Sequence, residues 1–111
     1  MRLCSQFLLA CSLCVAMMTA EKAAGADAVA GKAKAQTCTV CHGATGISTL
    51  PDAPNLAGQP EVYLSNQLHA YRNGDRRHEV MSLVAKGLSN DEIADVAAWF
   101  SSIHIEAKLP N

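Results

Sequence analysis

Five consecutive residues carry the clearest chemical signal in the chain, and they read Cys38-Thr39-Val40-Cys41-His42. The pattern Cys-x-x-Cys-His is typical of covalent haem attachment. Two thiols at this spacing can add to the two vinyl groups of a porphyrin, and the histidine that follows can bind the iron from one face. The segment therefore predicts that Cys38 and Cys41 hold one haem c through thioether bonds and that His42 is an iron ligand.

Two other kinds of site also use a Cys-x-x-Cys pair. Redox disulfides of the thioredoxin type carry one, but they lie in a βαβ context that this sequence lacks. Structural zinc sites need four ligands, and no second cysteine pair lies after Ala26. Haem attachment is therefore the interpretation that best fits the motif and its surroundings.

The N-terminal end of the 111-residue chain is typical of a secretory signal peptide. Arg2 supplies a positive charge, and a single apolar run follows it. That run is short for a membrane span, which needs about 20 residues. An Ala-Gly-Ala cleavage site ends at Ala26. We therefore expect a signal peptide over residues 1–26, export to the periplasm, and one domain over residues 27–111.

Two alternatives to this cleavage site stay open. Small residues that end at Ala20 form a second candidate, although the bulky Met18 weakens it. Residues 8–11, Leu-Leu-Ala-Cys, read as a lipobox, which would leave the mature chain anchored through a lipid on Cys11.

Removal of the signal peptide changes both the cysteine count and the charge. Only Cys38 and Cys41 remain, together with seven Lys or Arg and nine Asp or Glu. This balance gives no reason to expect nucleic-acid binding, and we expect no membrane span in the mature chain. A domain this small buries a limited apolar core, which a covalent haem would enlarge and staple together.

Three segments are predicted to be helices, which makes the domain all-α. Residues 27–37 begin at Asp27, a favourable cap. Gly31 in their middle fits either simple tolerance of a glycine or a close crossing with another helix, and we expect the crossing. Residues 60–73 begin with a proline and stop before Gly74. The apolar stripe of this second helix predicts its core face: Leu64, Leu68 and Tyr71.

The third helix is predicted over residues 89–103. Ser89 and Glu92 form a capping box at its start. Apolar residues at helical spacing predict its buried face: Ile93, Val96, Ala97, Phe100 and Ile103. Trp99 and Phe100 are bulky enough to pack against the glycine of the first helix.

Two residues outside these helices are candidates for the haem environment. Pro54 lies in a long loop rich in Gly and Pro, residues 43–60, and its carbonyl oxygen can accept a hydrogen bond from Nδ1 of His42. Met81 is expected in a short loop before the last helix. There its thioether can bind the second face of the iron and raise the reduction potential. His78 is the rival for this sixth position.

Polar side chains near these positions allow several interpretations. A concentration of basic residues fits a solvated rim, pairing with haem propionates, or docking of an acidic partner: Arg72, Arg76, Arg77 and Lys86. Tyr63 and Gln67 share a helix face, which fits either packing and solvation or hydrogen bonding near a propionate.

The motifs occur in a fixed order: a helix with a central glycine, then CTVCHG, PNLAGQ, YRNGDR, VMSLVAKGLS and DEIADVAAWF. This ordered set resembles a monohaem class I cytochrome c, and is similar to one half of the bacterial dihaem cytochromes c. The resemblance implies a small class I cytochrome c fold, in which three main helices and their loops wrap around one covalent haem. It implies that Cys38 and Cys41 carry the thioethers, that His42 and Met81 bind iron, and that Pro54 offers its carbonyl to His42.

Two departures from the family pattern are visible. The chain has only one haem motif, which excludes a dihaem role for this chain alone. Relatives often have a proline just after the methionine ligand, and Met81 lacks one. The resemblance therefore implies neither the stiffness of this loop nor the reduction potential.

These expectations indicate a periplasmic electron carrier rather than an enzyme, a monomer or weak dimer that meets donor and acceptor proteins. Iron with both axial positions filled leaves no place for a substrate. Exchange is expected at an exposed haem edge, where Val40, Ala44 and Ile47 supply small apolar contacts. Two alternatives stay open: a haem c subunit or module of a respiratory oxidase or dehydrogenase complex, and a gas-binding haem sensor in which Met81 is easily displaced.

Overall fold

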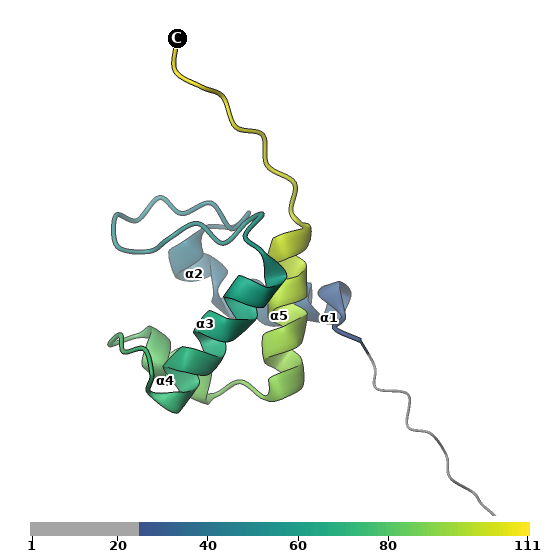
Figure 1. Ribbon diagram of the computed structural model, residues 1–111, viewed down its shortest axis with the longest axis vertical. Coiled ribbons are helices and arrows are strands. Elements are labelled where there is room, and N and C mark those ends of the chain that lie inside the picture. Colours follow the sequence, from purple (N-terminus) through teal and green to yellow (C-terminus); the bar gives the residue numbers. More distant parts are fainter. Residues whose placement is uncertain (1–24) are drawn as a thin grey trace, which may run out of the picture.

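The computed structural model describes residues 25–111, which form helices joined by loops, with no strand among them (Figure 1). The elements in chain order are α1 (Ala28–Lys34), the 3-10 turn η1 (Ala35–Thr37), α2 (Thr39–His42), α3 (Glu61–Asn73), α4 (Met81–Lys86) and α5 (Asn90–Ser102). The prediction of an all-α domain is therefore confirmed. The predicted signal peptide, residues 1–26, lies almost wholly outside the described residues and stays a prediction.

α1 begins where the sequence predicts. Oδ1 of Asp27 accepts hydrogen bonds from the backbone N–H groups of Val29 at 2.8 Å and Ala30 at 3.3 Å. These bonds satisfy donors that the first turn of a helix leaves without partners. The backbone N–H of Asp27 itself donates to Oδ1 of Asp95 in α5 at 2.7 Å. The cap therefore starts α1 and also ties it to α5.

α1 and α5 cross in close contact at Gly31 (Figure 1). A Cβ atom on Gly31 would lie 1.9 Å from the carbonyl oxygen of Asp95 and 3.0 Å from Cβ of Trp99, so a side chain does not fit. The predicted close crossing and its contact with Trp99 are confirmed. Phe100 belongs to the same core cluster as Ala35, one turn further along the chain, and its predicted contact with Gly31 itself stays a prediction.

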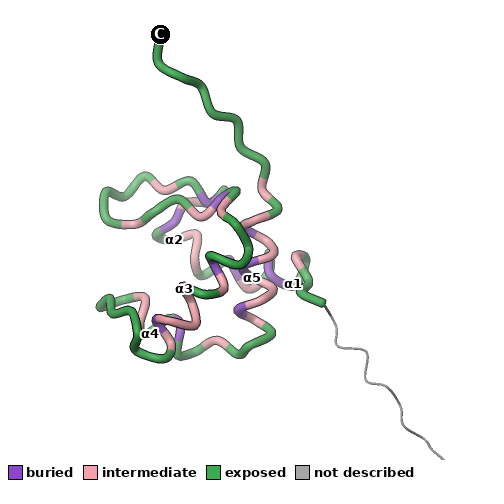
Figure 2. Tube along the Cα trace, in the orientation of Figure 1, coloured by how far each residue is buried: buried purple, intermediate pink, exposed green. Residues whose placement is uncertain are grey.

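The apolar core lies where α5 meets α3 and the end of α1 (Figure 2). On α3, Leu64 and Tyr71 are buried, and Leu68 packs against the core cluster. The predicted face of α5 is buried or packed on that cluster throughout: Ile93, Val96, Ala97, Phe100 and Ile103. Both predicted apolar faces are confirmed, although α5 ends one residue early, at Ser102.

The connection between α3 and α5 differs from its prediction. α3 ends as expected at Gly74, which has a left-handed φ of 87°. The sequence predicts a short loop around Met81, and this is wrong, because Met81 is the first residue of α4. The residues after Met81, Ser-Leu-Val-Ala-Lys, contain neither Pro nor Gly, so nothing interrupts a helix before Gly87.

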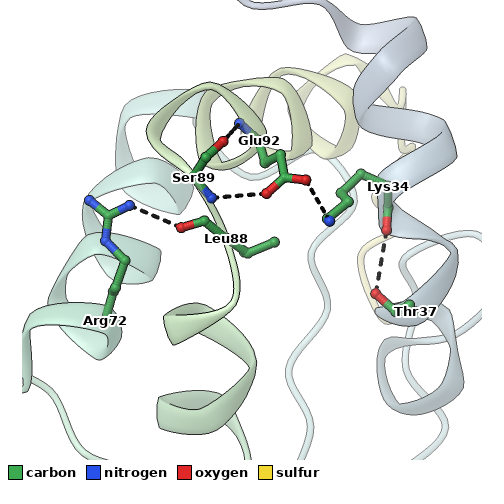
Figure 3. Close-up of polar contacts among 6 residues, drawn as sticks. All are labelled: Lys34, Thr37, Arg72, Leu88, Ser89 and Glu92. Atoms are coloured by element: carbon green, nitrogen blue, oxygen red, sulfur yellow. Dashed lines mark hydrogen bonds and ion pairs between the residues drawn. The ribbon is translucent and has the colours of Figure 1, made fainter.

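Figure 3 shows the capping box at the start of α5. The backbone N–H of Ser89 donates to Oε2 of Glu92 at 2.9 Å, and the backbone N–H of Glu92 donates to Oγ of Ser89 at 3.1 Å. The other carboxylate oxygen, Oε1, lies 2.6 Å from Nζ of Lys34. The bond from Lys34, followed by that from the Ser89 backbone, lowers the pKa of Glu92. The predicted box is confirmed, and it ties α5 to α1 a second time.

The lowered pKa of Glu92 predicts a pH dependence of stability. A carboxylate with a lower pKa in the folded state stabilises the fold above its unfolded pKa, and this contribution is lost as the pH falls through the folded pKa. We expect the thermal midpoint to fall between about pH 5 and about pH 3. It should fall less in Glu92→Gln, which keeps the capping geometry but cannot form an ion pair with Lys34. Circular dichroism melts across this range measure both slopes, and equal slopes would contradict the assignment.

The crossing at Gly31 predicts a cost for any side chain there. Gly31→Ala should lower the free energy of unfolding by ~1–3 kcal/mol, because the helices must move apart. This range is the net loss, after the ~1 kcal/mol that alanine adds to helix propensity. Guanidinium unfolding measures the difference. Ala33→Gly, at an exposed position of the same helix, is the matched control and should cost about 1 kcal/mol at most. A Gly31→Ala variant as stable as the wild type would show that the crossing tolerates a methyl group.

Candidate functional site

A cavity of about 350 Å³ lies between α2, α3, α4 and the loop that follows α2. The residues that the sequence selects all line it: Cys38, Cys41, His42, Pro54 and Met81. Its apolar walls come from the core faces of α3 and α5: Leu64, Leu68, Tyr71, Val96 and Phe100. A mostly apolar cavity with a few convergent polar groups is typical of a cofactor site.

His42 is the polar residue whose geometry is most narrowly defined. Its side chain is 6% exposed, and its Nδ1 lies 2.8 Å from the carbonyl oxygen of Pro54. A carbonyl oxygen only accepts hydrogen bonds, so Nδ1 must carry the proton and donate it. The remaining ring nitrogen, Nε2, then keeps its lone pair. This tautomer is the one in which a histidine can bind a metal through Nε2.

Glycines in the loop after α2 bring Pro54 back to His42. Gly43 ends α2 with φ of 84°, and a Cβ atom there would lie 1.9 Å from a carbonyl oxygen of the same loop. Gly46 follows, and its carbonyl oxygen accepts the backbone N–H of Leu56 at 2.8 Å. This bond closes the loop on itself. The His42–Pro54 hydrogen bond therefore depends on backbone turns that a side chain would obstruct.

Cys38 is the N-cap of α2 and Cys41 is its third residue, so the two lie about one helical turn apart, and no disulfide joins them. Cys41 is exposed, whereas Cys38 is half-buried and packs against the core cluster. Burial raises the pKa of the Cys38 thiol, so this sulfur has little thiolate character in the folded chain. Two thiols beside one cavity are the pair that thioether attachment needs.

Met81 and His78 both line the cavity, but they are bonded differently. Nδ1 of His78 lies 3.2 Å from the backbone nitrogen of Val80 and 3.3 Å from that of Met81, so it accepts from these N–H groups. In a neutral ring the proton is then on Nε2, which leaves that nitrogen no lone pair for a metal. The Met81 thioether, half-buried at the start of α4, has no such restriction. The arrangement favours Met81 over His78 as an iron ligand.

The polar rim of the cavity is formed by three side chains of α3 and the turn after it. Arg76 donates from Nη1 to Oε1 of Gln67 at 2.7 Å, and both residues line the cavity together with Tyr63. One positive charge and two hydrogen-bonding side chains therefore meet at this edge. Such a rim suits an anionic group at the edge of an otherwise apolar ligand.

The other basic residues of this region have different surroundings. Arg72 donates from Nη1 to the carbonyl oxygen of Leu88 at 3.1 Å (Figure 3) and from Nη2 to Oδ1 of Asn90 at 2.6 Å. It therefore holds the segment between α4 and α5 in place. Arg77 and Lys86 line a separate, shallow depression between α3 and α4. Only Arg76 of the predicted basic group reaches the cavity.

The set of donors fits a covalently attached haem. Two thiols, an imidazole nitrogen with a free lone pair and a thioether surround an apolar space with a basic rim. Among residues 25–111, no three His, Cys, Asp or Glu side chains gather closely enough to hold a metal ion by themselves. A bare structural zinc site, the alternative use of a Cys-x-x-Cys pair, therefore lacks its ligands in this part of the chain.

None of the helices in the described part of the chain is both long and apolar enough to cross a membrane.

Residues 28–104 match the family model described as cytochrome c. The chain is 46% identical over 79 residues to cytochrome c-554(548) of Halomonas halodenitrificans, which covers 68% of this chain and 95% of that protein. It is 40% identical over 88 residues to a protein of Thiomonas intermedia named thiosulfate dehydrogenase electron acceptor, covering 78% of this chain and 40% of that one.

The fold is also similar to that of reduced cytochrome c4 from Pseudomonas stutzeri, with a TM-score of 0.67 and 39% identity. The match covers 73% of this chain and 47% of the cytochrome c4 chain. The chain therefore spans nearly all of one relative and less than half the length of two longer ones.

Proposed function

The chain belongs to the cytochrome c family, and on this basis we propose that it carries single electrons on one covalent haem c, with His42 and Met81 as axial ligands. The class I cytochrome c fold that the motifs predict is confirmed by the helical structure and its likeness to cytochrome c4. The proposal is of a protein that transports electrons and performs no catalysis of its own.

The observation that carries this proposal is the hydrogen bond from Nδ1 of His42 to the carbonyl oxygen of Pro54 at 2.8 Å. Bound haem supplies an iron that exchanges one electron between its ferrous and ferric states. The Pro54 carbonyl fixes the tautomer and orientation of His42 and raises the basicity of Nε2. A strong, fixed ligand keeps the iron surroundings similar in both oxidation states, which favours electron transfer over ligand exchange.

Other residues of the cavity have separate roles in the proposal. Cys38 and Cys41 hold the haem edge covalently, so the cofactor is retained in a small domain. Met81 supplies a soft thioether, which stabilises ferrous iron and raises the reduction potential. Arg76 and Tyr63 lie where they can pair with a haem propionate.

We place the electron-exchange surface beside the two cysteines. Val40 is 81% exposed, and Ile47 and Leu50 are 42% and 45% exposed, while Cys41 and Ala44 are exposed as well. We propose that these exposed side chains, which lie within ten residues of Cys41 in the chain, form a small apolar contact surface. A small apolar contact suits the weak, short-lived complexes of redox partners.

We propose that the protein works in the periplasm after removal of residues 1–26, as a monomer or weak dimer that meets donor and acceptor proteins. The relative from Thiomonas intermedia is named as the electron acceptor of a thiosulfate dehydrogenase. The partner in its name is therefore a redox enzyme that donates electrons. The proposed partners are therefore other redox proteins, with no nucleic acid involved.

A second candidate function follows from the lengths of the relatives. The chain matches only 40% of one relative and 47% of the cytochrome c4 chain, so this fold also occurs as part of longer proteins. The same domain could then be a haem c subunit or module of a respiratory oxidase or dehydrogenase complex. The two functions differ in whether the haem domain travels alone or with an enzyme.

A single experiment on native periplasmic extract tests both the cofactor and this choice. We expect the protein to elute in gel filtration at the size of a monomer or dimer. The same fractions should show the absorption spectrum of a low-spin haem. The colour should stay with the polypeptide after acid–acetone extraction, because thioether bonds resist it. Co-elution with a large enzyme would favour the module, and colour lost to the acetone phase would contradict Cys38 and Cys41 as attachment points.

Replacement of Met81 tests the axial ligand. In Met81→Ala we expect the weak absorption at about 700 nm of the oxidised protein to vanish and the midpoint potential to fall, because the thioether is lost. Leu83→Ala, at a 70% exposed position of the same helix, is the matched control and should keep both properties. If Met81→Ala keeps both, another residue is the ligand. Rapid binding of carbon monoxide by the reduced wild type would instead favour the gas-binding function.

A further inference from the structure

The start of α4 is held by a residue three positions before it. Val80, the residue next to α4, makes no side-chain cap. His78 takes that role, since its Nδ1 accepts from the backbone N–H groups of Val80 at 3.2 Å and Met81 at 3.3 Å. Val80 is the N-cap residue and Met81 the first residue of α4, so neither N–H has an acceptor within this helix.

The contact is reciprocal. The backbone N–H of His78 donates to Oγ of Ser82 at 3.0 Å, and the backbone N–H of Ser82 donates to the carbonyl oxygen of His78 at 3.0 Å. This arrangement works like a capping box, with an imidazole nitrogen in place of the usual hydroxyl or carboxylate oxygen. It fixes the backbone on both sides of Met81.

The His78 ring is positioned in turn by α3. Its ring meets that of buried Tyr71 edge to face, with centroids 6.5 Å apart and planes at 73°. Tyr71 also contacts Arg76, whose guanidinium carbon lies over the ring, 4.6 Å from its centroid. Arg76 in turn donates a hydrogen bond to Oε1 of Gln67 at 2.7 Å. This contact with α3 therefore adds to the hydrogen bonds that orient the exposed His78 ring.

We propose that His78 is a positioning residue for the methionine ligand, and that it acts on the backbone of Met81 rather than on iron. The inference rests on the proposed ligation by Met81. By holding the first turn of α4 in one place, His78 keeps the thioether directed at the cavity. His78 cannot have both roles in a neutral ring. Capping needs the lone pair on Nδ1, so the proton is on Nε2. Binding iron through Nε2 needs the lone pair on Nε2, so the proton would have to be on Nδ1.

The test compares variants of the haem-loaded protein at position 78. His78→Asn supplies a side-chain oxygen that caps helices well, so it should keep the absorption at about 700 nm and bind carbon monoxide as slowly as the wild type. His78→Leu removes the acceptor. This variant should lose the absorption at a lower temperature than the wild type does. When reduced, it should bind carbon monoxide about fivefold faster than the wild type, because the loss of a helix cap corresponds to a rate change of about this size. Ser82→Ala, which removes the reciprocal bond, should change both in the same direction.

Controls separate positioning from general destabilisation. Ala33→Gly lowers helix stability at an exposed position of α1 that does not line the cavity, and it should leave carbon monoxide binding near the wild-type rate under native conditions. If Met81→Ala loses the absorption but His78→Leu matches the wild type, Met81 is the ligand and the positioning role is wrong. If Met81→Ala keeps the absorption, the ligand assignment is wrong. If His78→Asn behaves like His78→Leu, capping is not the reason for the effect.

Discussion

The contact between α1 and α5 is the constraint on which the remaining structure depends. Gly31 lets the two helices meet backbone to backbone, and the Asp27–Asp95 and Lys34–Glu92 contacts hold the crossing at both ends of α1. Because α1 leads through η1 directly into α2, this crossing also decides where Cys38 lies. The attachment segment is thus positioned by a helix pair that makes no use of haem chemistry.

The two proposed axial ligands are held in different ways. His42 is buried and fixed by a loop whose glycines leave no room for side chains. Met81 begins a six-residue helix with exposed neighbours, Val80 at 50% and Leu83 at 70%, and α4 packs mainly against α3. Few buried apolar contacts mean a lower free energy of local opening. The methionine side of the cavity is therefore expected to open first.

Sequence reasoning worked best where local rules and burial agree. The cap at Asp27, the box at Ser89 and the close approach at Gly31 each follow from a residue type at a known helix position. The conformation at Met81 differs most from its prediction, since it depends on a cap whose side-chain acceptors are Nδ1 of His78 and Oγ of Ser82. Histidine is not among the common capping residues, and the sequence signal is only a His followed four residues later by a serine.

The five site residues could be predicted from the sequence, but the walls and shape of the cavity could not. Cys38, Pro54 and Met81 are separated by 16 and 27 residues along the chain, and only the packing of α3 and α5 brings them to one place. The Leu64–Tyr71 face was assigned to the core, and it forms both the core and the cavity wall. A periodic apolar pattern shows that a face is buried, but not whether protein or cofactor buries it.

The burial of Cys38 has a consequence for the order of events during synthesis. Asp27 and Asp95, which join the first and last helices, are separated by 68 positions, so the core cannot close until the C-terminal end of the chain is present. Before that moment the Cys38 thiol is in water and its pKa is not raised by burial. After closure it is less reactive and harder to reach. The Cys38 thiol is therefore most accessible before α5 packs, whereas Cys41 is exposed in the folded structure as well.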